Sequence, residues 1–304
     1  MLKSIQNIIE QTSTVFLDKR DAIKLSVVCL LADGHLLIED VPGVGKTTLV
    51  QTLGQLLALK THRIQFTIDL LPADILGGNI YNPKSQDFNF YPGPLFAQLV
   101  LADELNRASP RTQSALLQAM EEMAVSIDGF THTLLRPFFV IATQNPHHNI
   151  GTFPLPESQL DRFLMSLELH YPSPETEQKI FQMNSSRERM EKLQPVLTGE
   201  ELIKLQNEIK LIKVSDVVAS YVSQFLENSR KENVPGESLS TRCGLSLIRA
   251  AKAWAYIEGR DYIKAEDVQK VFIPVTGHRL GGKAGVAQGR LWSKTILEMT
   301  PAPR

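Results

Sequence analysis

A short glycine-rich segment contains the residue types with the clearest chemistry. Gly43 and Gly45 allow the backbone to turn so that its N–H groups face inward, which is the geometry that binds phosphate oxygens. Lys46 would place its ammonium group between the β- and γ-phosphates of a nucleotide, and the Thr47 hydroxyl would bind Mg²⁺. The predicted phosphate-binding loop comprises Pro42, Gly43, Val44, Gly45, Lys46, Thr47 and Thr48.

The context of this loop supports the interpretation, although one position departs from the full pattern. The loop follows the apolar run His35–Glu39 and precedes a helix-like stretch at 47–59, whose positive amino-terminal end would also face the phosphates. The usual pattern begins with a glycine where this chain has Asp40, and the Asp40 carboxylate would repel phosphate if it pointed inward. A glycine-rich turn that binds no ligand is the alternative.

A pair of acidic residues follows the apolar run Leu99–Ala102 and predicts hydrolysis. Asp103 would hold Mg²⁺ directly or through one of its waters, and Glu104 would polarise and orient the attacking water. Strand alternation points the two side chains in different directions, which suits different roles. A solvated turn is the alternative for this pair. The pair also disfavours a kinase, which needs an acceptor site and an acid placed for that acceptor.

A polar stretch after a further apolar run predicts a sensor of the γ-phosphate. The run Phe138–Ala142 leads through Thr143 and Gln144 to Asn145. A strand running beside the strand of Asp103 would bring Asn145 close to the attacking water. An ordinary Asn-Pro turn is the alternative explanation of this residue.

The elements that must position these residues indicate an α/β fold. Nearly continuous apolar runs are typical of strands that are buried on both faces in a parallel sheet. Helix-like stretches at 47–59 and 111–123 separate them, and residues 79–94 are expected to form an irregular insertion or a hairpin. The five predicted strands are His35–Glu39, Arg63–Thr67, Gln98–Ala102, Phe138–Ala142 and Phe163–Leu169.

The second half of the chain has a different texture. Tyr171–Glu175 contains two prolines and predicts a hinge between domains. Residues 176–273 have helical periodicity, and the glycine- and alanine-rich stretch from about 281 is expected to be loosely ordered. We therefore expect a nucleotide-binding core over 1–172 and a helical lid domain over 176–304.

Composition limits the classes of partner and the compartment. The 304 residues have a formal net charge of −1, which gives no electrostatic reason to expect nucleic acid or an anionic membrane as main partner. Neither of the two cysteines, Cys29 and Cys243, has a neighbour at metal-ligand spacing, so buried free thiols in a reducing compartment are expected. With no signal-peptide-like or membrane-spanning run visible, we expect a cytoplasmic protein.

Taken together, these residues resemble the MoxR family of AAA+ ATPases. The resemblance is spread over residues 35–165 and continues more weakly through Ala250–Ala255 and Glu258–Tyr262. In this family the missing glycine at Asp40 is usual. The matching stretches are Glu39–Thr47, Leu71–Gly77, Tyr91–Phe96, Leu101–Arg107, Thr112–Leu117, Ala142–Pro146 and Pro154–Phe163.

The resemblance implies a three-layer αβα core with a five-stranded parallel sheet, followed by an all-α lid. It also implies a ring, usually a hexamer, with ATP between subunits. Arg162 matches the arginine finger that reaches the neighbouring subunit's γ-phosphate. A salt bridge of Arg162 with Asp161 or Glu157 is the alternative, and Arg107 and Arg111 compete for the role.

Arg242 resembles a second sensor arginine, which would link the lid angle to the γ-phosphate. The family has Ser-Pro-Arg where this chain has Ser240, Thr241 and Arg242. The resemblance further implies an ATP-driven chaperone that remodels a protein client, commonly a von Willebrand A-domain protein. A nucleic-acid motor or loader and a nucleotide-dependent scaffold with little turnover are the alternatives. The neutral charge disfavours the first alternative, and Glu104, Asn145 and Arg162 disfavour the second.

Overall fold

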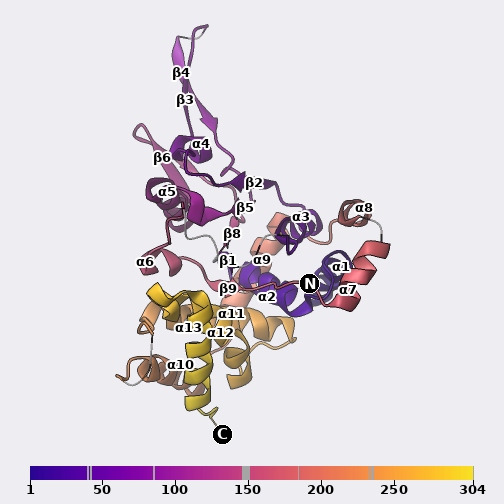
Figure 1. The fold of residues 1–304 in the computed structure, drawn as a ribbon, viewed down its shortest axis with the longest axis vertical. Helices are drawn as coiled ribbons and strands as arrows, with labels where there is room; N and C mark the ends of the chain where they lie inside the picture. The colour runs from indigo at the N-terminus through magenta and orange to yellow at the C-terminus, as the bar shows by residue number, and fades with distance from the viewer. Residues whose placement is uncertain are drawn as a thin grey trace.

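The computed structural model describes residues 1–39, 41, 43–84, 86–145, 151–183, 185–232, 234 and 236–303. Its centre is a parallel sheet of five strands in the order β2-β5-β8-β1-β9 (Figure 1). All five predicted strands are present, with ends shifted by at most two residues. They are β1 (Leu36–Glu39), β2 (Thr61–Gln65), β5 (Leu99–Asp103), β8 (Phe139–Gln144) and β9 (Met165–Leu167).

The sheet is covered on both faces, which gives the predicted three layers. Successive strand residues alternate between two hydrophobic clusters, so Leu36 and Leu99 lie in one cluster and Leu37 and Val100 in the other. Helices α1 (Leu2–Val15), α2 (Arg20–Leu31) and α3 (Lys46–Leu56) pack in the first cluster. Helix α5 (Pro110–Glu122) packs in the second, together with the short α4 (Pro72–Leu76). Burial on both faces explains why β1, β5 and β8 are apolar without alternation, whereas β2 alternates and exposes Arg63 and Gln65.

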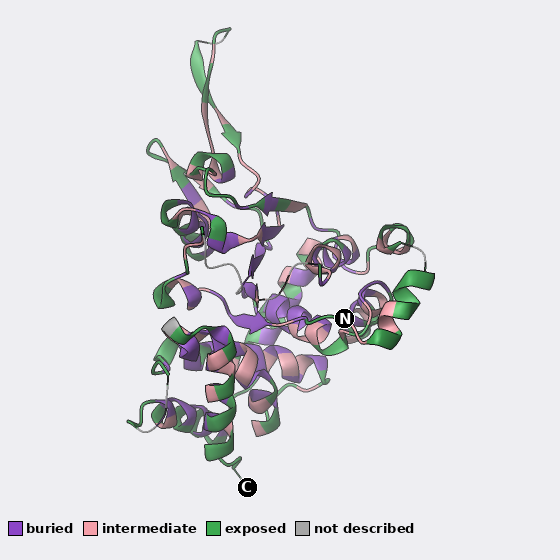
Figure 2. Ribbon diagram, in the orientation of Figure 1, coloured by how far each residue is buried: buried purple, intermediate pink, exposed green. Residues whose placement is uncertain are grey.

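Two hairpins extend from this second layer. Strands β3 (Gly77–Asn82) and β4 (Asp87–Pro92) form a hairpin that projects beyond the rest of the molecule, and its outer part is exposed (Figures 1 and 2). The hairpin alternative for residues 79–94 is therefore correct. A second hairpin, β6 (Ala124–Ile127) with β7 (Phe130–Thr133), has no counterpart in the prediction. Phe90 stacks on His132 at 3.7 Å between ring centroids, which joins the two hairpins.

After the predicted hinge, the described part of the chain forms seven α-helices and no strand. These helices are α7 (Pro174–Gln182), α8 (Ser186–Glu191), α9 (Gly199–Lys210), α10 (Asp216–Ser229), α11 (Thr241–Ile257), α12 (Ala265–Gly281) and α13 (Val286–Met299). The first of them stay close to the core. Arg189 of α8 donates to the Val15 carbonyl at 3.0 Å, and Gln55 of α3 donates to the Met190 carbonyl at 2.9 Å. These hydrogen bonds join residues before and after 171–175. The domain boundary at this segment therefore remains a prediction.

The expectation of a loosely ordered stretch from residue 281 is wrong. Helix α13 packs along α12, with Ser293 and Ile296 fully buried. A Cβ atom added at Gly289 would lie 2.0 Å from the Gly277 carbonyl oxygen. The glycines in this region thus allow two helix backbones to approach closely, and they do not indicate flexibility.

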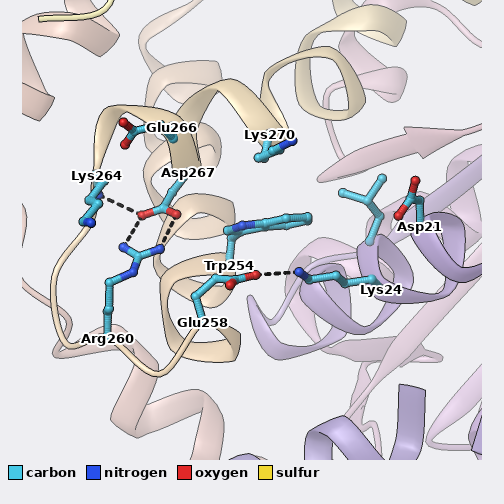
Figure 3. Close-up of a pocket in the computed structure, with 10 residues that line it drawn as sticks. Asp21, Lys24, Trp254, Glu258, Arg260, Lys264, Glu266, Asp267 and Lys270 are labelled. Carbon is cyan, nitrogen blue, oxygen red and sulfur yellow. Dashed lines mark hydrogen bonds and ion pairs between the residues drawn. The ribbon is translucent and has the colours of Figure 1, made fainter. Parts of the chain in front are cut away.

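Polar contacts join the amino-terminal helices to the second half. Lys24 of α2 donates to Glu258 at 2.5 Å and lies 4.1 Å from the centroid of the Trp254 ring on α11 (Figure 3). Beside them, Arg260 makes two hydrogen bonds to the buried Asp267, at 2.5 and 2.6 Å. None of the described helices is both long and apolar enough to span a bilayer.

Candidate functional site

The glycine-rich loop leaves the carboxyl end of β1 and enters α3 at Lys46. Gly43 and Gly45 have φ angles of 86° and 92°, a left-handed conformation that side chains rarely adopt. The ring of Phe16 packs against Gly45, where an added Cβ would lie only 2.7 Å from it. Both glycines are therefore required by the backbone. Pro42 and Asp40 lie outside the described residues.

The loop and the acidic pair meet in one cavity of about 360 Å³. Val44 and Thr48 do not line this cavity, and the buried Val44 side chain packs into the hydrophobic core instead. The lining residues are Gly43, Gly45, Lys46, Thr47, Arg63, Gln65, Asp103, Glu104 and Asn145. The fold thus brings together the predicted phosphate-binding, metal-binding, water-orienting and sensor residues.

Asp103 ends β5 with both carboxylate oxygens engaged. Its Oδ1 accepts from the Thr143 hydroxyl at 2.7 Å, and its Oδ2 accepts from Arg63 Nη2 at 2.6 Å and Nε at 3.2 Å. The Thr143 oxygen also accepts from the backbone N–H of Glu104 at 2.8 Å. Thr143 therefore fixes the strand end that holds both acidic residues.

Glu104 lies in the same cavity because the strand ends in an unusual turn. Its φ of 58° is left-handed, and a 3-10 turn over Leu105–Arg107 follows. Its Oε2 accepts from Gln65 Nε2 at 3.0 Å and from Arg107 Nη1 at 2.9 Å. Strand alternation alone would point adjacent side chains to opposite faces of the sheet. The turn explains how adjacent acidic residues face a common space.

Asn145 follows β8, which lies beside β5 as the sensor hypothesis requires. The residue is buried and lines the cavity, and its carbonyl accepts from Asn106 Nδ2 at 3.3 Å. Residues 146–150 lie outside the described part of the chain.

The donor set of the cavity fits a magnesium ion. Mg²⁺ prefers oxygen ligands, and in nucleotide sites it takes one or two from the protein and the rest from phosphates and water. The Thr47 hydroxyl and the Asp103 carboxylate line one cavity next to Lys46, and they supply such oxygens. Among the described residues, no group of three or more His, Cys, Asp or Glu side chains could hold a different metal.

Three polar residues of this site have no counterpart in the prediction. The sequence indicates Arg63 and Gln65 only as part of a strand, and Thr143 only as part of the link to Asn145. The polar side chains at alternate positions of β2 could have indicated a polar face. Their relevance depends on β2 lying next to β5, with Gln65 opposite Asp103 in the register.

The two predicted arginines lie elsewhere, in a second cavity of about 310 Å³. Arg162 forms an ion pair with Glu121, and Arg242 lies 3.6 Å from Asp161 and 4.0 Å from Glu121. In the described structure the partner of Arg162 is thus neither Asp161 nor Glu157. His35, which precedes β1, also lines this cavity. Because the phosphate loop follows β1, the two cavities lie at opposite ends of that strand.

Three buried titratable side chains, those of His35, Cys29 and Cys243, do not line the first cavity. His35 accepts from the Val140 N–H with Nδ1 at 3.1 Å and faces the Met120 carbonyl with Nε2 at 3.4 Å. Burial lowers its pKa from 6.5 to about 4, so the ring is neutral near pH 7. Cys29 and Cys243 are buried free thiols, as predicted, and burial raises the pKa of Cys243 to about 11.

Comparisons with known proteins agree with this geometry. Residues 35–165 match the ATPase family associated with various cellular activities (AAA), and residues 238–294 match the AAA lid domain. The chain is 37% identical to Chaperone MoxR1 of Mycobacterium tuberculosis, over 91% of this chain and 75% of that protein. It is 44% identical to the uncharacterised protein YeaC of Bacillus subtilis, over 90% of this chain and 85% of that protein.

A solved structure shows the same fold over the whole chain. The crystal structure of a provisionally assigned ATPase from Cytophaga hutchinsonii superposes with a TM-score of 0.88 at 34% identity. The match covers 100% of this chain and 96% of that one. The loop, the acidic pair and these relatives together show that the chain belongs to the MoxR family of AAA+ ATPases.

Proposed function

We propose that this ATPase binds ATP with Mg²⁺ in the cavity beside β1 and hydrolyses it there. The observation that supports this most strongly is the common cavity of Lys46, Thr47, Asp103, Glu104 and Asn145. These residues come from three separate segments of the chain. Only the sheet order β5-β8-β1 brings the three segments together.

Each residue has a role that its chemistry supports. The loop N–H groups and Lys46 hold the phosphates, while Thr47 and Asp103 hold Mg²⁺, which neutralises charge on the phosphate oxygens when bound. Glu104 accepts hydrogen bonds at one of its carboxylate oxygens and would orient the attacking water. Asn145 would donate to the water or to the γ-phosphate from the end of the neighbouring strand.

Completion of this site would require a neighbouring subunit. Arg162 and Arg242 share a cavity at the opposite end of β1, so neither side chain lines the phosphate cavity of its own chain. We infer that both arginines face the next subunit's nucleotide in a closed ring, for which the family suggests a hexamer. Arg242 would then sense the neighbour's γ-phosphate and transmit its presence to α11, whose first turn contains it.

The client of this ATPase is proposed to be a protein. The relative with 37% identity is named a chaperone, and the net charge of −1 offers no attraction to nucleic acid. Within the family, a von Willebrand A-domain protein is the class of client we propose. Capture by a hydrolysis-deficient variant in ATP would identify it.

The test of the site uses Glu104→Gln and Lys46→Ala. We expect Glu104→Gln to bind ATP with near-normal affinity and to lose at least about 10²-fold in kcat, since the water is no longer oriented. Lys46→Ala should weaken binding itself. Equilibrium binding of a fluorescent ATP analogue and phosphate release measure the two effects separately.

A matched control is Glu122→Gln, which changes an exposed glutamate at the end of α5. It should leave both binding and turnover unchanged. Normal turnover by Glu104→Gln would exclude Glu104 as the water-orienting residue.

A further inference from the structure

The first cavity contains a cation that the proposed roles leave unexplained. Arg63 of β2 lines it together with Lys46 and makes two hydrogen bonds to one oxygen of Asp103. Asp103 is also the carboxylate proposed to hold Mg²⁺. Its other oxygen accepts from Thr143, so both oxygens are engaged with protein donors. A metal ion that binds Asp103 directly must therefore compete with Arg63.

The exposure of the two side chains indicates that the ion pair between Arg63 and Asp103 can separate. The Arg63 side chain is 52% exposed, whereas that of Asp103 is 16% exposed. Exposed ion pairs contribute little to stability, because water solvates the charges when they separate. A divalent ion with its compact charge can displace the guanidinium at this small cost. Arg63 also donates to the neutral Gln65 amide oxygen at 2.8 Å, but it cannot lose its charge, so on release another anion or water must replace the carboxylate.

Triphosphate oxygens would be anions within the same cavity as the released side chain. Gly43, Gly45 and Thr47 line the same cavity as Arg63, and they form the proposed phosphate cradle. Guanidinium groups bind phosphate with paired hydrogen bonds, which makes arginine well suited to this exchange.

We propose that Arg63 is a positioning residue that exchanges partners during nucleotide binding. It holds Asp103 when no metal is present, and it binds phosphate oxygens once Mg²⁺ occupies Asp103. This inference rests on the proposed function of the cavity. Its consequence is that Arg63 favours ATP over ADP and prevents tight Mg²⁺ binding in the absence of a γ-phosphate.

The test compares Arg63→Ala and Arg63→Gln with their parent, all in the Glu104→Gln background so that ATP persists. Mg²⁺ is titrated at fixed fluorescent ADP or fluorescent ATP, and nucleotide binding is measured by anisotropy. With ADP, the Mg²⁺ midpoint should fall about two- to fivefold, because a competing cation of modest strength is gone. With ATP, affinity at saturating Mg²⁺ should fall about tenfold, because a charge-assisted phosphate contact is lost.

Two controls separate this role from a structural one. Arg63→Lys keeps the charge but loses the paired hydrogen bonds, so it should lie between the parent and Arg63→Ala in both measurements. Arg187→Ala removes an exposed arginine whose ion pair is with Glu191 on α8, and it should change neither measurement.

The signature of the exchange is a lower Mg²⁺ midpoint with ADP together with a weaker affinity for ATP. Equal weakening of ADP and ATP in both Arg63→Ala and Arg63→Gln would overturn it, and so would an unchanged Mg²⁺ midpoint with ADP. If the parent variant bound neither nucleotide, the proposed function would fail and the exchange with it.

Discussion

At the scale of single residues, the site depends on hydrogen bonds that set side-chain positions before any ligand arrives. Thr143 connects Asp103 to the Glu104 backbone, and Gln65 and Arg107 both donate to one Glu104 oxygen. Such preorganisation lowers the cost of placing charges where a reaction needs them. The same holds away from the cavity, where neutral His35 spans β8 and α5.

His35 predicts a pH dependence of stability. Its folded-state pKa of about 4 lies below the ordinary 6.5, so the unfolded chain takes up a proton first as the pH falls. The unfolding free energy should therefore decrease through this window, by about 2 kcal/mol between pH 7.5 and pH 5. Urea unfolding at the two pH values measures the loss.

His35→Gln is the comparison for this effect, since it keeps a donor and an acceptor but does not titrate. The variant should be less stable near pH 7 but less sensitive to pH. Burial also lowers the pKa of His278, and that contribution is present in both proteins. Identical losses in the two proteins would show that His35 does not take part.

At the scale of elements, strand order and helix approach decide which residues meet. Strands β2 and β5 are neighbours although about 35 residues separate them, and this places Gln65 opposite Asp103. In the second half, α12 and α13 touch through glycines, and the Thr276 and Ser293 hydroxyls share a hydrogen bond of 2.8 Å between them. Where two helices pack this closely, an added carbon atom is expected to lower the free energy of unfolding.

Gly289→Ala is expected to separate α12 from α13. The new Cβ would lie 2.0 Å from the Gly277 carbonyl oxygen and 2.4 Å from the Gly281 nitrogen, which are backbone atoms that cannot move alone. We expect a loss of about 1–3 kcal/mol in unfolding free energy, despite the better helix propensity of alanine. Thermal or urea unfolding gives this value.

The matched substitution is Gly244→Ala on α11. There the added Cβ would approach the end of the Leu226 side chain at 3.1 Å, and a side chain can shift. This variant should be close to neutral. A Gly289→Ala protein as stable as Gly244→Ala would contradict the close-approach explanation.

At the scale of the whole molecule, the two cavities at opposite ends of β1 separate nucleotide binding from the arginines proposed to complete it. Glu121 and Asp161 hold Arg162 and Arg242 in the single chain. An isolated subunit should therefore bind ATP but hydrolyse it poorly. Hydrolysis should rise with protein concentration as subunits associate.

Mixing experiments test the proposed interface. Arg162→Ala should lower kcat by about 10³-fold or more while sparing ATP binding, as loss of an arginine finger does in related enzymes. Mixing Arg162→Ala with Lys46→Ala should restore part of the activity. The reason is that an intact loop from the first variant can meet an intact arginine from the second. Phosphate release from the mixture measures the recovery.

The control mixture combines Lys46→Ala with Glu104→Gln. Both changes damage the loop cavity, so no pairing of these subunits contains a complete site and no recovery is expected. Equal phosphate release from the two mixtures, with mixed oligomers shown to form, would count against an arginine supplied by a neighbour.

The local chemistry of this protein is readable from the chain itself. One five-residue segment contains Gly43, Gly45, Lys46 and Thr47, so the sequence alone predicts that they bind phosphate together. Apart from Arg63–Thr67, whose apolar residues alternate with polar ones, the predicted strands are apolar runs, which are typical of strands buried between two layers. The acidic pair at the end of one run and Asn145 after another predict a site at the carboxyl edge of the sheet.

Tertiary structure alone decided which distant residues join that site. Arg63 and Gln65 reach Asp103 and Glu104 because β2 pairs with β5, and no local pattern encodes that pairing. The placement of Arg162 beside Arg242 likewise depends on how α11 packs near α5. The glycines from residue 281 onward predict loose order, because the sequence alone does not distinguish a flexible glycine from one packed closely against another helix. Local patterns reflect short-range physics, whereas these contacts arise only when segments far apart in the chain pack together.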